Sequence, residues 1–140
     1  MKGNVYGYLI GSDIQIDIGA GTVTRIYLSR KLNTHSTEAI FLGATPMSLL
    51  VYLLARVDHE VIHYGDILHD VWDARGLISS YKRMGQVIKE LKEKLAMMGL
   101  SGDIISTVRG VGYRLNLPAV TCLRYEVITV PKCQLGVSRL

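Results

Sequence analysis

The stretch TVRGVGYRL, residues 107–115, constrains the fold of this 140-residue chain more than any other. Two β-prone runs flank a short Gly-Val-Gly segment, residues 110–112. Glycines at these positions suit a turn that needs a positive φ or a close approach of another backbone. The pattern predicts a β-hairpin over 104–117 with Arg109 exposed at its tip.

A long amphipathic pattern directly precedes this hairpin. Apolar residues at spacings of three and four predict a helix from about Ser80 to Met98, and Gly99 provides the stop. The expected buried face consists of Tyr81, Met84, Ile88, Leu91, Leu95 and Met98. The opposite face carries Lys82, Gln86, Lys89 and Glu93, with Arg83 beside them. A basic helix followed by a hairpin with a basic tip is the layout of a winged helix-turn-helix.

The residues before this helix predict a small sheet and two further helices. Alternating runs indicate strands over 5–10, 14–18 and 23–28, a polar loop over 30–38 and a short fourth strand over 39–42. Thr45 is the expected N-cap of a first helix with Pro46 in its first turn. A second helix is expected over 64–72, followed by a loop over 73–78.

These elements predict an α+β fold. We expect a winged helix-turn-helix of three helices and a C-terminal β-hairpin wing, joined to an N-terminal antiparallel β-sheet platform. The expected division is a platform over 1–43, a winged-helix core over 44–117 and a tail or linker of unknown role over 118–140. The tail has one β-like run, residues 125–130.

The net charge is +4, and the excess positive charge is localised. The window 73–117 holds eight basic and four acidic residues, whereas the rest of the chain is balanced. A localised basic surface suggests a polyanionic partner, although charge alone fits a solvated surface equally well. Glu90 and Lys94 have the spacing of a surface ion pair.

Other classes of protein find little support in the sequence. Residues 1–10 lack a signal-peptide pattern, and the most apolar run, 47–55, is too short to span a bilayer. Cys122 and Cys133 are expected to be reduced thiols in the cytoplasm. His59, His63 and His69 could suggest a zinc site, but the first two span a predicted loop and no HExxH pattern is present. We expect no metal, no cofactor and no enzymatic activity.

Four segments together resemble the OmpR/PhoB family of transcription regulators, in the family's order and at its spacings. They are Thr45-Pro46 with its Leu-rich helix, Val61-Ile62 before a helix ending Val71-Trp72, Ile88-x-x-Leu91-x-x-Lys94-Leu95, and residues 107–115. The N-terminal strands, with Tyr8-Leu9-Ile10, resemble the platform of the ToxR/CadC-like branch. The resemblance covers residues 6–117 and implies a bacterial, sequence-specific DNA-binding regulator that is similar to the output domain of a two-component system.

The expected DNA contacts come partly from the residues and partly from the resemblance. Lys82 and Arg83 oppose the helix dipole in the first turn, which makes sense if they meet DNA in the major groove. Gln86 can bond adenine, and Lys89 can reach a phosphate or pair with Glu93. The resemblance implies a minor-groove contact for Arg109 and a backbone contact for Thr107. Arg114 on the wing strand completes the set.

Three residues depart from the family pattern. His63 stands where many members have Ser, Glu90 stands where many have Arg, and Gly85 is unusual in mid-helix. Gly85 fits either a close approach to DNA or a tight contact with a neighbouring helix. Glu90 and Gly85 also favour the alternative function, a winged-helix protein-interaction module without DNA readout.

The resemblance further implies a head-to-tail homodimer on direct-repeat DNA. RNA polymerase, through the loop 73–78, is a further candidate partner. The expected location is the cytoplasm. If the natural chain continues past residue 140 into a membrane tether, this part would be the cytoplasmic part of an inner-membrane regulator.

Overall fold

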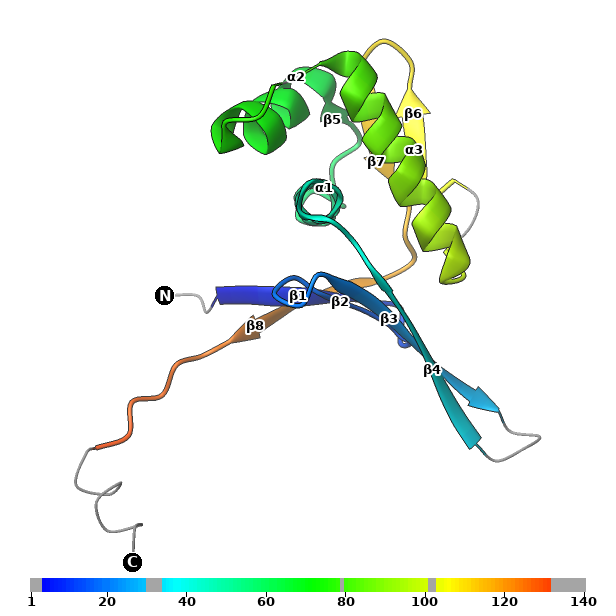
Figure 1. Cartoon of the computed structure of the whole chain (residues 1–140), viewed down its shortest axis with the longest axis vertical. Coiled ribbons are helices and arrows are strands. Elements are labelled where there is room, and N and C mark those ends of the chain that lie inside the picture. The colour runs from blue at the N-terminus through cyan, green and yellow to red at the C-terminus, as the bar shows by residue number, and fades with distance from the viewer. Residues whose placement is uncertain (1–3, 30–33, 79, 101–102, 132–140) are drawn as a thin grey trace, which may run out of the picture.

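The computed structural model describes residues 4–29, 34–78, 80–100 and 103–131. A β-platform forms the base of the molecule, and helix α1 lies directly above it (Figure 1). Helix α2 and a β-hairpin lie on the far side of α1, and α3 runs from that region past α1 down to the platform. Within the described ranges, no helix has both the length and the apolar character needed to cross a bilayer.

The platform is a five-stranded antiparallel sheet of order β4-β3-β2-β1-β8. The expected N-terminal antiparallel sheet is therefore confirmed. Its strands are β1 Asn4–Ile10, β2 Ile14–Asp17, β3 Thr22–Ser29, β4 Thr34–Phe41 and β8 Val120–Tyr125.

Strand β4 is longer than the sequence indicated. The expected loop over 30–38 is wrong for residues 34–38, which pair with β3 from Glu38 opposite Arg25 to Thr34 opposite Ser29. Backbone hydrogen bonds to a neighbouring strand do not require apolar side chains. Polar, exposed residues such as Thr37 therefore gave no strand signal.

The tail also contributes to the platform. The expected strand over 125–130 is wrong, because the strand is β8, which ends at Tyr125, and 126–131 belong to no strand. Strand β8 pairs with β1, with Cys122 opposite Tyr8. It thereby covers an edge of β1 that would otherwise expose unpaired backbone groups.

Helix α1, Ala44–Leu54, begins one residue before the expected cap. Thr45 is not the N-cap; Gly43 is, without a side-chain cap, and its carbonyl accepts from the N–H of Met47 at 3.0 Å. Pro46 lies in the first turn, where a missing N–H costs nothing. One continuous core joins α1 to the platform and to α3, with buried members that include Ile10, Ile16, Val23, Leu50, Leu53, Leu91 and Leu95.

The second helical segment changes its winding along its length. It begins as α2, Tyr64–Ile67, continues as a π-helical turn, Leu68–Trp72, and ends as a 3₁₀ turn, Asp73–Arg75. Gly76, with φ of 72°, terminates it. The helix expected over 64–72 is present, whereas the loop expected over 73–78 is wrong for 73–75.

Helix α3, Tyr81–Met97, confirms the predicted long helix. Its N-cap is Ser80, whose Oγ accepts from the backbone N–H of Arg83 at 3.0 Å, and Gly99 with φ of 87° follows its end. The expected inward position of Tyr81 is wrong: its side chain is 63% exposed and its ring meets Tyr64 edge-on. The buried residues of this face are Met84, Val87, Ile88, Leu91, Leu95 and Met98.

The predicted hairpin is present as β6, Ile105–Val108, and β7, Gly112–Leu115. Strand β5, Ile62–His63, adds to β7 and gives the order β5-β7-β6. Gly110 has φ of 75°, and a Cβ on Gly112 would overlap the carbonyl of Ile62. The two expected roles of glycine, a positive φ and a close approach of another backbone, are therefore both found. The α+β winged-helix fold is confirmed.

Candidate nucleic-acid interface

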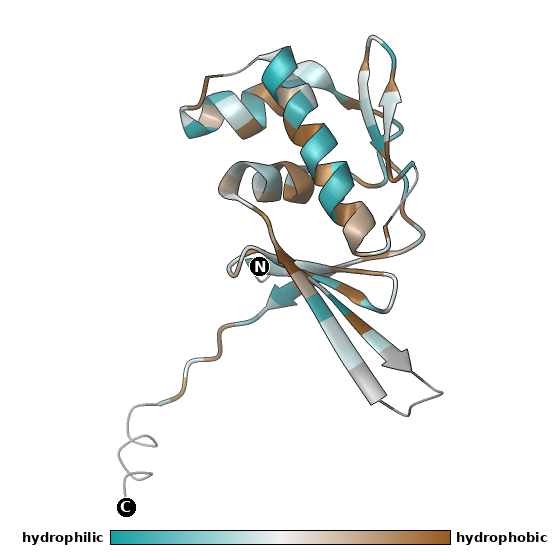
Figure 2. Cartoon of the chain, turned by 45° about the vertical axis from the view of Figure 1, so that its right-hand side comes forward, coloured by the Kyte–Doolittle hydropathy of each residue, from teal (hydrophilic) through white to brown (hydrophobic). Residues whose placement is uncertain are grey.

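The outward face of α3 is polar and open to solvent. Hydrophilic residues follow this face along the length of the helix (Figure 2). The four predicted contacts on α3 are all exposed: Lys82, Arg83, Gln86 and Lys89. Within the described part of the chain, their side chains make no hydrogen bond and no ion pair.

The first turn of α3 places cations where the helix dipole disfavours them. Lys82 and Arg83 lie in this turn, and the turn contains no acidic residue. The N-terminal end of a helix carries the equivalent of about half a positive charge, which attracts anions and repels cations. Only the neutral Ser80 hydroxyl caps it. The arrangement costs helix stability and leaves two cations free to meet an external anion.

Two expected side-chain pairs on α3 are not formed. Lys89 makes no ion pair with Glu93, which leaves its ammonium available. The expected pair of Glu90 and Lys94 is also absent, because Lys94 Nζ donates to the carbonyl of Phe41 at 3.3 Å instead.

Gly85 lies in open space. A Cβ at this position would meet no atom within 4 Å, so a tight contact with a neighbouring helix is excluded. Of the two expected roles of Gly85, close approach to DNA therefore remains a prediction. A hollow of about 340 Å³ lies between α3 and the wing, and Gly85, Lys89 and Thr107 are among its lining residues.

The wing places its predicted residues on two different faces. Thr107 is exposed and lies opposite the buried Tyr113 in the ladder, on the face toward α3. Arg114 follows Tyr113 and therefore points to the other face, where its Nε donates to the carbonyl of Glu60 at 2.6 Å. Arg109 lies in the turn between the strands, exposed and without a partner among the described residues.

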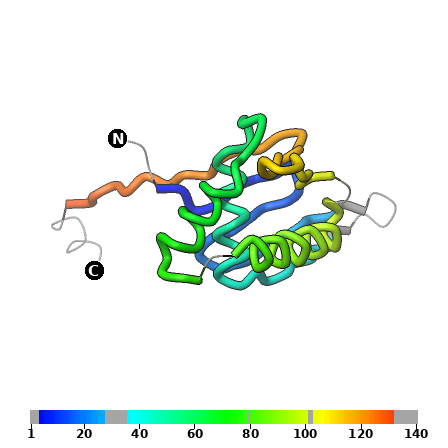
Figure 3. The backbone as a smooth tube through the Cα atoms, turned by 90° about the horizontal axis from the view of Figure 1, so that it is seen from above, coloured from blue at the N-terminus to red at the C-terminus, as the bar shows by residue number. Residues whose placement is uncertain are grey.

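The wing turn and the N-terminal end of α3 lie at the same end of the molecule, away from the platform (Figures 1 and 2). The view from above separates the two elements, which overlap in Figure 1 (Figure 3). The fold thus brings the α3 residues and the wing tip to one end, while Arg114 faces away from α3.

The three candidate zinc ligands are divided between two places: His59 and His63 line one hollow, whereas His69 contacts Asp70. His69 Nδ1 lies 2.8 Å from Asp70 Oδ1, and this hydrogen bond raises the pKa of His69. Asp70 also accepts from the Tyr52 hydroxyl at 2.6 Å; burial and this bond raise the pKa of Tyr52 to about 12. The described ranges contain no group of three or more His, Cys, Asp or Glu that could hold a metal ion. Cys122 is a free thiol, and Cys133 lies outside the described residues.

One polar residue that the sequence interpretation missed is Arg25 on β3. It lies two residues after the buried Val23, so it shares the core-facing side of the strand. A charged residue on the core-facing side of an alternating strand is the signal that could have found it. Its contacts are with Asp13, Tyr27 and the end of α3.

Three helices, a basic polar face on the third and a β-hairpin wing define a winged helix-turn-helix protein. The family model described as "Transcriptional regulatory protein, C terminal" matches residues 37–115. The chain belongs to this family, which is of the OmpR/PhoB type and is not enzymatic. It is therefore a DNA-binding transcriptional regulator, as the resemblance implied.

Solved structures show the same fold. The DNA-binding domain of E. coli CadC is 22% identical, with a TM-score of 0.64 over 88% of this chain and 100% of that chain. The C-terminal domain of the nisin resistance regulator NsrR, a lantibiotic response regulator, is 27% identical. Its TM-score is 0.50 over 67% of this chain and 94% of that chain. A search of curated proteins found no match.

Proposed function

We propose that the N-terminal half of α3 enters the major groove of duplex DNA and that the wing tip contacts the adjacent minor groove. The observation that carries this proposal is a pair of exposed cations, Lys82 and Arg83, at the helix end that disfavours them. Neither side chain has a partner among the residues that the structure describes. A phosphate or base edge would compensate both cations, and recognition helices present this half of the helix to DNA.

Each side chain has a role that follows from its position. Lys82, Arg83 and Lys89 neutralise phosphates, which supplies most of the affinity. Gln86, one turn into α3, reads a base edge, and Arg109 enters a narrow A·T-rich minor groove.

The other two wing residues, Thr107 and Arg114, contact the DNA backbone and do not read base edges. Thr107 bonds the DNA backbone from the wing face that is turned toward α3, where it lines the hollow. Arg114 reaches a phosphate from the other face of the wing, since within the described ranges only its Nε is bonded, to the carbonyl of Glu60.

The proposal extends to the oligomeric state on DNA, the cellular location and the contact with RNA polymerase. Two copies bind direct repeats head to tail, in the bacterial cytoplasm, with a membrane tether if the natural chain continues beyond residue 140. RNA polymerase contacts the segment 73–78, and the 92% exposure of Ile78 supports this choice. Large exposed apolar side chains of this kind mark protein contacts when they cluster, and Leu77 beside it is also exposed.

The protein-interaction module without DNA readout gains no support from the described residues. Glu90 is exposed on α3 and a Cβ on Gly85 would meet no atom within 4 Å, so both positions are open to solvent and neither distinguishes a protein partner from DNA.

Selection of duplexes from a random-sequence pool, followed by titration, tests the proposal. The selected duplex should bind far more tightly than a scrambled duplex of equal length, and the affinity for both should fall steeply with salt. Equal affinity for both duplexes, without salt dependence, would contradict it.

A further inference from the structure

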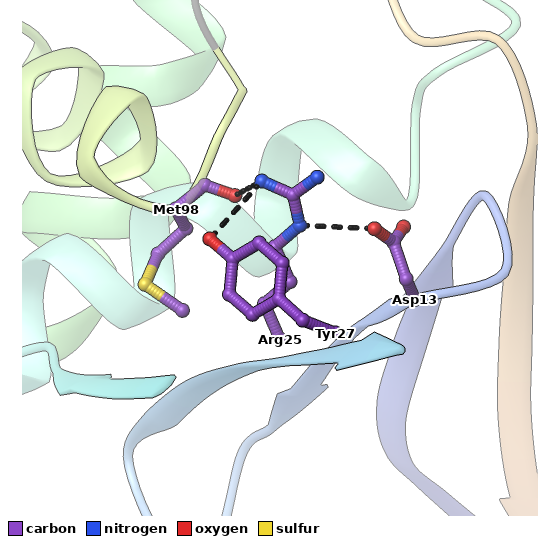
Figure 4. Close-up of polar contacts among 4 residues, drawn as sticks. All are labelled: Asp13, Arg25, Tyr27 and Met98. Atoms are coloured by element: carbon purple, nitrogen blue, oxygen red, sulfur yellow. Dashed lines mark hydrogen bonds and ion pairs between the residues drawn. The ribbon is translucent and has the colours of Figure 1, made fainter. Parts of the chain in front are cut away.

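A single guanidinium joins the platform to the end of α3 (Figure 4). Arg25 Nε donates to Asp13 Oδ2 at 2.9 Å, and Arg25 Nη1 donates to the Met98 carbonyl at 3.2 Å and to the Tyr27 hydroxyl at 3.3 Å. The guanidinium carbon also lies 4.4 Å from the centre of the Tyr27 ring. The three partners come from the β1–β2 turn, from β3 and from the end of α3.

The platform side of this contact is itself fixed. The backbone N–H of Ile26, next to Arg25, donates to the Asp13 carbonyl at 3.1 Å. Asp13 is thereby bonded to β3 through both its backbone and its carboxylate. The guanidinium is therefore held on the platform by its bonds to Asp13 and Tyr27.

The helix side of the contact is suited to a cation. The last carbonyls of a helix lack intrahelical partners and form the negative end of the dipole, so a guanidinium at the Met98 carbonyl is favourable. A Cβ on Gly99 would overlap this guanidinium. Glycine at 99 therefore both terminates α3 and leaves the room that Arg25 occupies.

The ties between α3 and the platform lie in the C-terminal half of the helix. Besides Arg25, the side-chain hydrogen bond from α3 to the platform in the described ranges is that of Lys94 to the Phe41 carbonyl. The N-terminal half, which carries Lys82 and Gln86, has none. About 24 Å separates Lys82 from Met98 at 1.5 Å per residue, so a tilt of about 5° at the tied end moves Lys82 by roughly 2 Å.

We propose that Arg25 is a positioning residue for DNA recognition. It fixes the tilt of α3 on the platform and so places the base-reading side chains at the far end of the helix. The inference rests on the proposed function, in which α3 is the recognition helix. Arg25 acts through α3 and does not itself contact DNA.

Two variants separate positioning from folding and from charge. Arg25→Met keeps an unbranched apolar stem and removes every donor, whereas Asp13→Asn keeps an oxygen acceptor for Arg25 Nε. Each is titrated by fluorescence anisotropy against a duplex selected by the wild-type protein and a scrambled duplex, at a temperature where thermal melting shows the variant folded. Lys82→Ala is measured in parallel.

Arg25→Met should bind the selected duplex roughly tenfold more weakly, because one misplaced base contact typically costs about that much. Binding to the scrambled duplex should change by less than about twofold, and the salt slope should stay unchanged, since no phosphate contact is lost. Asp13→Asn should stay close to wild type on both duplexes.

Several results would overturn the inference. Full discrimination in folded Arg25→Met would show that the contact serves stability alone. An equal loss on both duplexes, with a flatter salt slope, would make Arg25 a direct phosphate contact. If Arg25→Met does not fold, Arg25→Lys takes its place, because lysine keeps the charge but cannot bond Asp13 and Met98 as a fork. Arg25→Lys should then lose part of the discrimination, and full discrimination would again overturn the inference.

The parallel variant distinguishes failure of the positioning role from failure of the proposed function. If Lys82→Ala leaves both affinities unaltered, α3 is not the recognition helix and the proposed function fails together with the inference. If Lys82→Ala weakens both while Arg25→Met discriminates as well as wild type, only the positioning role fails.

Discussion

At the scale of single residues, Lys82 is expected to affect the stability of the protein and its DNA affinity in opposite directions. Lys82 is exposed in the first turn of α3, so its replacement by alanine removes an unfavourable dipole interaction. Lys82→Ala should keep or slightly raise the stability of the protein. It should weaken binding to all DNA sequences similarly and flatten the logarithmic salt slope by about one unit.

Gel-shift titrations at several salt concentrations measure this slope. Lys94→Ala is the matched control on the same helix, because the Lys94 ammonium is bonded to the Phe41 carbonyl. The control should keep the wild-type slope. An unchanged slope in Lys82→Ala would remove this residue from the interface, and unchanged affinities as well would exclude α3 as the recognition helix.

Gly85 gives a second prediction at this scale. Its Cβ position is empty, so alanine should add helix propensity without a clash. Gly85→Ala should raise the free energy of unfolding by about 0.5–1 kcal/mol in urea titrations. The contrasting change is Gly112→Ala, which should destabilise the protein because the new methyl overlaps the Ile62 carbonyl. A loss of stability in Gly85→Ala would mean that the position is not open.

The contact of His69 with Asp70 predicts a pH dependence. Asp70 raises the pKa of His69, and the Tyr52 and His69 hydrogen bonds lower the pKa of Asp70. The raised His69 pKa contributes stability below the unfolded value of about 6.5 and loses it as the pH rises through the folded value. The lowered Asp70 pKa contributes above about 3.9 and is lost as the pH falls.

The pair therefore stabilises the protein mainly between these limits. His69→Asn should lower the urea midpoint more at about pH 5.5 than at about pH 8.5. The difference should be small, because the His69 side chain is 75% exposed. Equal changes at both pH values would show that the contact contributes no pH-dependent stability.

At the scale of elements, the sequence predicted best where the signal is local. The hairpin follows from Gly110 and Gly112, and α3 follows from its apolar spacing and its Gly99 stop; both were found where expected. Strands β4 and β8 were missed in part because their partners, not their own side chains, determine them. Neither strand alternates clearly, so only the ladder with β3 or β1 identifies it.

The wing gives a prediction at this scale, with a matched pair of variants. Arg109 is exposed in the turn, so Arg109→Ala should change stability by less than about 0.5 kcal/mol. It should cost about 1–3 kcal/mol of DNA affinity, most on sites with A·T-rich flanks, where a narrow minor groove attracts arginine.

Tyr113→Ala is the structural counterpart. The Tyr113 side chain is buried, and its ring centre lies 5.3 Å from that of Tyr64. Loss of a buried aromatic side chain should cost roughly 3–5 kcal/mol of stability. Thermal melting and binding on matched A·T-rich and G·C-rich flanks measure both variants. Unaltered affinity of Arg109→Ala on both flanks would exclude a DNA-reading wing.

At the scale of the whole molecule, one core unites the platform with the winged helix. The family and the placement of α3 and the wing at one end could be predicted from the sequence, because strong local motifs carry them. The link from Arg25 to Met98 could not, because it joins residues 73 positions apart. The sequence placed Arg114 beside the other wing contacts, whereas strand alternation turns it to the opposite face.

The central claim is that DNA contacts the outward face of α3 and the wing tip. The most direct measurement is a map of backbone amide NMR shifts on addition of a duplex selected by the protein, with a scrambled duplex for comparison. We predict that the largest changes fall on residues 81–89 of α3 and 107–111 of the wing, with small changes on the platform strands β2 and β3. Changes concentrated on the platform or on residues 126–131, with α3 and the wing unperturbed, would contradict the account.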